Sequence, residues 1–77
     1  MDISNVYVII GTGFSKDKIV DIIVQEGYKH NFCFARSEGG NGSNIDRSDE
    51  VWCFGDCEGQ HDHRMAKALG KDIWIMG

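Results

Sequence analysis

The sequence predicts a small α/β domain of three layers, with a four-stranded, mainly parallel sheet between two helices. Apolar runs typical of strands occupy residues 6–11, 31–35, 50–55 and 72–77. Helical spacing of apolar residues follows the first and the third run. This repeated strand–helix–strand order is typical of a parallel sheet. Right-handed crossovers that diverge from the centre then give the strand order 2-1-3-4, with one helix on each face.

The first half of the chain is predicted to form a strand, a helix and a strand. Residues 6–11, VYVIIG, are apolar at both odd and even positions, which face opposite sides of a strand. This pattern suits a strand that is covered on two sides. The helix is expected to begin after Ser15, a good N-cap residue, to carry Ile19 and Ile23 at helical spacing, and to end at Gly27. Residues 31–35, NFCFA, form the second predicted strand.

The second half begins with a predicted loop at residues 37–48, SEGGNGSNIDRS. Glycine and asparagine dominate it and it has one aliphatic residue, so we expect the most mobile segment of the chain. Within it, residues 39–44 are a candidate lid over a ligand. A strand at 50–55, a short helix that ends at Gly70 and a last strand at 72–77 complete the expected elements.

Length and composition narrow the class of protein. All 77 residues are expected to form a single domain. The net charge of -4 argues against a nucleic-acid binder, and no apolar run approaches the roughly 20 residues of a membrane helix. The amino terminus shows no signal-peptide pattern. Three cysteines, an odd number, predict reduced thiols and therefore a cytoplasmic protein.

Two helices on four strands would leave half of each sheet face bare. The large apolar residues Tyr7, Trp52, Phe54 and Trp74 would then need another cover. We therefore expect a homodimer, most simply a two-fold one. In the alternative, the glycine-rich loop and the chain ends cover enough surface for a monomer.

A ligand is expected at the carboxyl ends of the first and third strands, where the chain order reverses direction. Two glycine-containing loops arrive there and lead into helix amino termini, whose free N–H groups favour anions. The first loop contributes Gly11, Thr12, Gly13 and Ser15 as candidate binding residues. The second contributes Gly55, Asp56, Gly59, Gln60 and His61.

The same region carries residue types suited to metal binding and to thiol chemistry. Cys53, Cys57, His61 and His63 offer zinc-ligand types, but their spacing does not match the short cysteine knuckles of zinc sites, so no metal site is predicted. Whether these four bind a metal stays open at this point. Cys57 has no resolving cysteine at redox-motif spacing.

One stretch, SDEVWCFGDCEGQHDHRMAKALGKDIWI, resembles the carboxyl-terminal half of the nucleoside 2-deoxyribosyltransferase-like and SLOG nucleotide-binding families. The stretch YVIIGTGFS is similar to their first strand and loop. The resemblance implies a minimal Rossmann-like fold and a nucleotide ligand. It also places Asp62 where the transferases carry a glutamate nucleophile, whose side chain is one methylene longer than that of aspartate. Those families carry a helix between their second and third strands, and this sequence is expected to lack it.

The expected function is therefore the binding of a nucleotide or nucleotide-derived metabolite by a small cytoplasmic protein. Asp62 would accept a hydrogen bond from a sugar hydroxyl, and no cofactor is expected. The alternative is a protein–protein interaction module of phage or mobile-element type, possibly inhibitory, without a ligand. A weaker alternative is an enzyme that cleaves an N-glycosidic bond like a nucleoside deoxyribosyltransferase, with Asp62 as catalytic residue; binding without catalysis is favoured.

Overall fold

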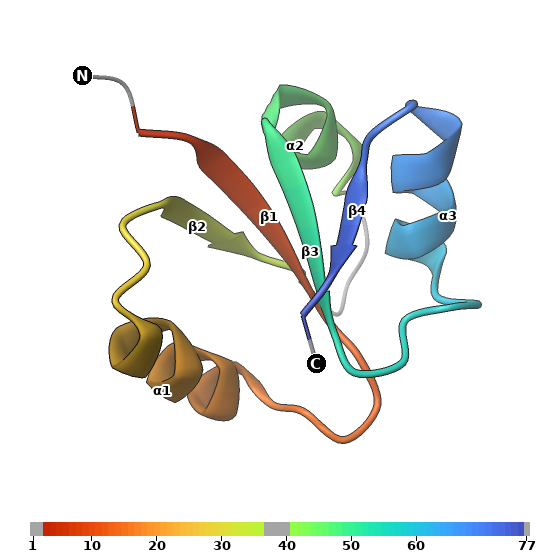
Figure 1. Ribbon diagram of the computed structural model, residues 1–77. Coiled ribbons are helices and arrows are strands. Elements are labelled where there is room, and N and C mark those ends of the chain that lie inside the picture. The colour runs from red at the N-terminus through yellow and green to blue at the C-terminus, as the bar shows by residue number, and fades with distance from the viewer. Residues whose placement is uncertain (1–2, 37–40, 77) are drawn as a thin grey trace.

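A computed structural model describes residues 3–36 and 41–76 and shows a four-stranded sheet of parallel strands (Figure 1). The strands are β1 (Asn5–Ile10), β2 (Asn31–Phe34), β3 (Glu50–Phe54) and β4 (Ile73–Ile75). Their order in the sheet is β2-β1-β3-β4, and each neighbouring pair is parallel. The predicted α/β fold class and the strand order 2-1-3-4 are confirmed.

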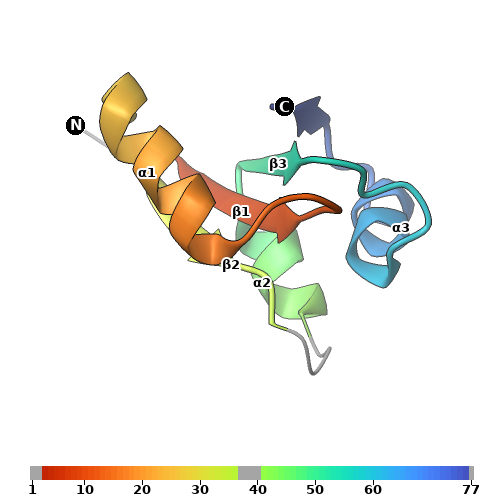
Figure 2. The ribbon, with the colours of Figure 1, turned by 90° about the horizontal axis from the view of Figure 1, so that it is seen from below.

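Within the described residues three helices cover the sheet, whereas the sequence predicted two. They are α1 (Lys16–Glu26), α2 (Gly42–Arg47) and α3 (His61–Ala68). Figure 2 shows α1 on one side of the sheet, with α2 and α3 on the other. The predicted placement of one helix on each face holds for α1 and α3, and α2 shares the face of α3.

The local chemistry of α1 agrees with the prediction at both ends. The side-chain oxygen of Ser15 accepts a hydrogen bond from the backbone N–H of Lys18 at 3.3 Å, which caps the first turn. Gly27 ends the helix in the left-handed conformation at φ 73°, where a residue without a β-carbon avoids strain. Ile19 and Ile23 are buried against the sheet, so one face of the helix anchors it.

The predicted loop at 37–48 is wrong at residues 42–47, which form α2. Ile45, the single aliphatic residue of that segment, is buried in the core and holds the short helix on the sheet. The predicted lid at 39–44 is wrong over its last four residues, because Asn41 is buried and 42–44 belong to the helix. Residues 37–40, including the first two of that lid, lie outside the described residues.

The core consists of two clusters, one on each face of the sheet, because successive strand residues point to opposite sides. On the α1 face the buried residues are Val6, Val8, Ile19, Ile23, Trp52 and Phe54. On the face of α2 and α3 they are Tyr7, Ile9, Ile45, Val51, Cys53, Cys57 and Ala66. β1 contributes to both clusters, which confirms the prediction that it is covered on two sides.

The chain itself covers three of the four aromatic residues that were expected to need a partner. Tyr7, Trp52 and Phe54 are buried, and only Trp74 is exposed, at 54%. Trp52 packs edge-on against Tyr28 and His30, with ring centroids 4.9 and 5.0 Å apart. The segment between α1 and β2 thus shields the part of the sheet that α1 leaves open.

The prediction of three reduced thiols is wrong. Cys53 and Cys57 form a disulfide, with Cα atoms 6.2 Å apart, and Cys33 is the free, exposed cysteine. Cys57 therefore has a bonded partner four positions away, a spacing at which the sequence did not predict one. The cysteine count consequently no longer supports a cytoplasmic location. None of the helices in 3–36 and 41–76 is long and apolar enough to cross a membrane.

Candidate ligand site at the carboxyl edge of the sheet

The loops after β1 and β3 meet at the carboxyl edge, as the strand order requires. The backbone N–H of Gly11 donates to the carbonyl oxygen of Phe54 at 2.7 Å. The N–H of Thr12 donates to the carbonyl oxygen of Asp56 at 3.2 Å, which makes an isolated antiparallel bridge between the two loops. The two predicted halves of the site are therefore one continuous surface.

This contact is so close that no space for a ligand remains between the two loops. A β-carbon on Gly11 would clash with the carbonyl of Phe54 and lie 2.9 Å from the backbone nitrogen of Asp56. A β-carbon on Gly55 would lie 2.9 Å from the ring of Phe14. The amides of Gly11 and Thr12, which were expected to cradle a ligand, already have partners in the protein.

The remaining residues predicted for the first loop lie on its outer side. Thr12, Gly13 and Ser15 are exposed, and Ser15 caps α1 with its hydroxyl oxygen. Gly13 has φ 90°, and the space around its α-carbon is open. These residues shape the turn into α1, and the cavity described below does not include them.

At the start of α3, Gln60 fastens the helix to β1. It occupies the N-cap position without a side-chain cap bond, and its Nε2 donates to the carbonyl oxygen of Ile10 at 3.2 Å. His61 is exposed and lies beside Asp62, with Nδ1 3.9 Å from Oδ1. Gly59, at φ 94°, supplies the sharp turn before the helix.

Asp62 points toward the α2 side of the sheet, where two side chains hold its carboxylate. The hydroxyl of Tyr7 donates to Oδ2 at 2.9 Å, and Nδ2 of Asn41 lies 3.0 and 3.3 Å from Oδ2 and Oδ1. Burial first, and then this hydrogen bond to Asp62, raise the pKa of Tyr7 well above its usual range. The Asp62 side chain is only 12% exposed. This carboxylate joins β1, α3 and the residue before α2.

A hollow of about 360 Å³ opens on the other side of the same loop, between the β3–α3 connection, α3 and the end of β4. Its polar lining consists of Asp56 and Glu58 from the connection and His63 and Lys67 from α3. Gly55, the Cys53–Cys57 disulfide and Ile75 complete it. We call it the carboxyl-edge hollow. Of the ligand-binding residues predicted from the sequence, Gly55 and Asp56 line it.

The charges around the carboxyl-edge hollow are arranged by sign. His63 and Lys67 are four positions apart on α3, so their side chains lie on the same helix face. Asp56 and Glu58 are held on the connection, where Oδ1 of Asp56 accepts the backbone N–H of Glu58 at 3.2 Å. In the described part of the chain, neither His63 nor Lys67 forms an ion pair.

The sequence did not reveal this grouping of side chains. On sequence grounds His63 was a candidate metal ligand or a neighbour that changes the proton affinity of nearby carboxylates. Lys67 was a candidate phosphate ligand, with a solvated helix face as the favoured interpretation. The four-residue spacing of the two was visible in the sequence, but its direction toward the β3–α3 connection was not. That direction depends on how α3 packs, with Ala66 buried against the sheet.

The metal hypothesis for Cys53, Cys57, His61 and His63 loses its two sulfur ligands, because the cysteines are bonded to each other. Among residues 3–36 and 41–76, no three His, Cys, Asp or Glu side chains gather closely enough to hold an ion.

Comparisons with protein-family models, with curated proteins and with solved structures find no match to this chain. The resemblance to nucleotide-binding families described above therefore stays an expectation drawn from the sequence.

Proposed function

We propose that this protein binds a nucleotide or a nucleotide-derived metabolite in the carboxyl-edge hollow. The observation that carries the proposal is the lining of that hollow, which has a volume of about 360 Å³. A lysine and a histidine on one helix face line it together with two carboxylates of the neighbouring connection. A nucleotide has the matching chemistry, since it combines an anionic phosphate with a sugar whose hydroxyl groups donate hydrogen bonds.

Each group has a role in this proposal. Lys67 and His63 bind the phosphate, because an ammonium and an imidazole N–H are donors to its oxygens. Asp56 and Glu58 accept from the sugar hydroxyl groups. The hollow is at the lower end of the size range of small-molecule sites, about 300–1,000 Å³. A nucleoside monophosphate is thus the largest nucleotide we expect to be enclosed.

Asp62 has no part in this proposal, and neither does catalysis. Its carboxylate oxygens already accept hydrogen bonds from Tyr7 and Asn41, and Asp62 is not among the residues that line the hollow. A sugar hydroxyl would have to displace those partners to reach it. Binding without turnover fits the arrangement better than glycosidic-bond cleavage.

A thermal-shift screen against nucleosides and nucleoside monophosphates tests the proposal. A ligand at about 100 times its dissociation constant adds roughly 2.7 kcal/mol to the free energy of unfolding, which raises the melting temperature by several degrees. We expect the monophosphates to stabilise more than the nucleosides, because Lys67 and His63 contact only the phosphate.

The matched variants are Lys67→Ala and Lys29→Ala, which remove the same charge. Both lysines are exposed, and Lys29 lies between α1 and β2, outside the lining of the hollow. Lys67→Ala should abolish the stabilisation by the monophosphate and Lys29→Ala should preserve it. Equal responses in the two variants, or a flat response of the unaltered protein across the panel, would contradict the proposal.

A further inference from the structure

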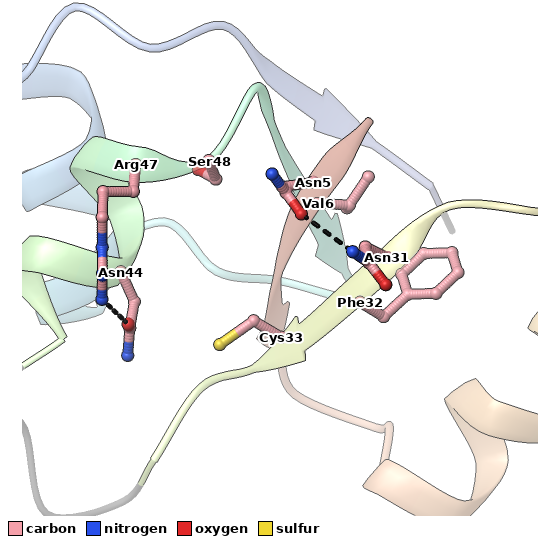
Figure 3. Close-up of a pocket in the computed structure, with 8 residues that line it drawn as sticks. All are labelled: Asn5, Val6, Asn31, Phe32, Cys33, Asn44, Arg47 and Ser48. Carbon is pink, nitrogen blue, oxygen red and sulfur yellow. Dashed lines mark hydrogen bonds between the residues drawn. The ribbon is translucent and has the colours of Figure 1, made fainter. Parts of the chain in front are cut away.

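A second cavity lies at the opposite edge of the sheet, at the amino ends of β1 and β2 (Figure 3). We call it the amino-edge pocket, and its volume is about 360 Å³. One wall comes from α2 and the other from the first residues of β1 and β2. Helix α2 has only six residues and leaves β2 uncovered on this face, so Asn31 and Cys33 are exposed.

On the α2 wall, Arg47 is held by its own helix in a defined orientation. Its Nε donates to the carbonyl oxygen of Ser43 at 3.3 Å, and its Nη2 donates to Oδ1 of Asn44 at 3.1 Å. These two bonds occupy the side of the guanidinium group. The end of the group, with the Nη1 hydrogens and the second Nη2 hydrogen, keeps the paired geometry that binds two oxygens of an anion.

On the strand wall, two asparagines form a fixed pair. Nδ2 of Asn31 donates to Oδ1 of Asn5 at 3.2 Å, as Figure 3 shows. Because Oδ1 of Asn5 is an acceptor in this pair, its Nδ2 group is left as a donor on the lining of the pocket. Across the gap, the Nδ2 group of Asn44 is also a donor, since its Oδ1 accepts from Arg47. Both walls therefore present N–H groups.

The charge of this pocket differs from that of the acidic protein around it. The described residues that line it include one cation, Arg47, and no carboxylate. Asp49 is not among the lining residues, and its carboxylate accepts the backbone N–H of Asn5 at 2.8 Å. The ammonium group of Lys71 adds a second positive charge nearby, 2.9 Å from the carbonyl oxygen of Ser48.

We infer that the amino-edge pocket binds the carboxylate or phosphate group of a small molecule, with the end of the Arg47 guanidinium and the side-chain amides of Asn5 and Asn44 as its donors. This site is separate from the carboxyl-edge hollow and shares no residue with it. Evidence against one proposal therefore does not count against the other.

The protein carries its own reporter for this site. Cys33 lines the pocket, its sulfur points into the gap toward α2, and it is the free cysteine of the chain, because the other two are bonded to each other. Its thiolate attacks the methylene carbon of iodoacetate or iodoacetamide, so that a sulfur–carbon bond forms and iodide leaves with the electron pair of the carbon–iodine bond. The two reagents have nearly the same size, and only iodoacetate carries a carboxylate.

The experiment compares the rates at which the two reagents modify Cys33, followed by mass spectrometry without added reductant. In the unaltered protein the pocket should attract iodoacetate, and Arg47→Gln should lower the ratio of the iodoacetate rate to the iodoacetamide rate about threefold. Arg64→Gln, which removes the same charge from an exposed position on α3, should leave that ratio unchanged. The iodoacetamide rate alone reports any change in the exposure of Cys33.

Inorganic phosphate provides a second arm that needs no variant. At constant ionic strength, replacing chloride by phosphate should slow modification of the unaltered protein by iodoacetate, because phosphate occupies the same donors. The inference is overturned if the reagent ratio is the same in the unaltered protein and in Arg47→Gln. Slower modification in phosphate would indicate a phosphoryl ligand. A lower reagent ratio in Arg47→Gln without any effect of phosphate would indicate a carboxylate ligand.

Discussion

The carboxylate of Asp62 connects three parts of the chain that are distant in sequence. It accepts from Tyr7, 55 positions earlier, and from Asn41, 21 positions earlier, whose Nδ2 also lies 3.2 Å from the carbonyl oxygen of Arg36. Asp62 lies in the first turn of α3, but no local sequence pattern could reveal partners so far away. The buried network gives Asp62 a role in stability.

Removing that carboxylate should destabilise the protein. Asp62→Ala removes the acceptor of the Tyr7 hydroxyl and leaves the Asn41 amide with only the carbonyl of Arg36, and each unsatisfied buried N–H or O–H costs about 1–3 kcal/mol. We expect a loss of roughly 3 kcal/mol in the free energy of unfolding, measured by urea denaturation. Asp17→Ala, in the exposed first turn of α1, is the matched control and should cost no more than about 1 kcal/mol. Similar losses for both variants would refute the network.

Tyr7 should make the stability depend on alkaline pH. Its folded pKa is raised above the unfolded value of about 10, so the stability it contributes is complete below about pH 10. Above that pH the phenol ionises in the unfolded chain but stays protonated in the folded one, and the free energy of unfolding falls by about 1.4 kcal/mol per pH unit. Tyr7→Phe should lack this fall. Urea denaturation at a series of alkaline pH values checks it, and parallel pH profiles for the two proteins would be the opposing result.

Among the elements, the loop after β1 needs glycine at two positions for different reasons. One position has no space for a β-carbon, and the other has a positive φ. Gly11 lies against the backbone of Phe54 and Asp56, whereas Gly13 has open space and φ 90°. Gly11→Ala should therefore force the loops apart and cost more than about 3 kcal/mol, beyond the roughly 1–2 kcal/mol that a positive φ costs Gly13→Ala. Thermal denaturation of both variants tests this order. A larger loss in Gly13→Ala would contradict the loop contact.

The helices show what a local pattern can and cannot predict. Helix α1 was predicted with its cap and its stop, because Ser15, Ile19, Ile23 and Gly27 carry that information in consecutive turns. Helix α2 was missed, because its segment has poor helix formers and a single aliphatic residue. What stabilises α2 is tertiary contact, with Ile45 buried in the core. The disulfide was missed for a similar reason, since only the fold shows that Cys53 and Cys57 approach each other.

At the scale of the whole molecule, the strand order followed from the alternation of strands and helices and from the handedness of crossovers, so it needed no detail of packing. From the sequence, the ligand was expected between the two loops at the carboxyl edge, whereas the proposed site lies at the same edge beside α3. The close contact of the loops at Gly11 and Gly55 moves the available space to the α3 side. Such a contact depends on distances that a sequence does not contain.

The homodimer expected from the sequence remains a prediction, and the β4 edge is the surface that would carry it. Trp74 and Ile75 are 54% and 68% exposed there. The N–H of Met76 donates inward to β3 at 2.8 Å, so the backbone groups of Ile73 and Ile75 point outward. An antiparallel pairing of two β4 strands centred on Trp74 would satisfy those groups and stack the two indoles across the two-fold axis.

This dimer would bury little surface, below the roughly 1,200 Å² of a standard interface, so we expect reversible, concentration-dependent association. Sedimentation velocity over a concentration series measures it. Trp74→Ser should shift the protein toward monomer, and Val24→Ser, which removes an exposed apolar side chain from α1, should not. A monomer at every concentration would disprove the dimer.

The central claim is that the carboxyl-edge hollow holds a nucleotide, and a two-dimensional amide NMR titration tests it most directly. The titrant is the nucleoside monophosphate that raises the melting temperature most. The account predicts that the largest shifts fall on Gly55, Glu58, His63 and Lys67, with saturation, while Asn31 and Arg47 at the opposite edge change less. Shifts centred away from the hollow, or an unchanged spectrum at the highest concentration, would contradict it.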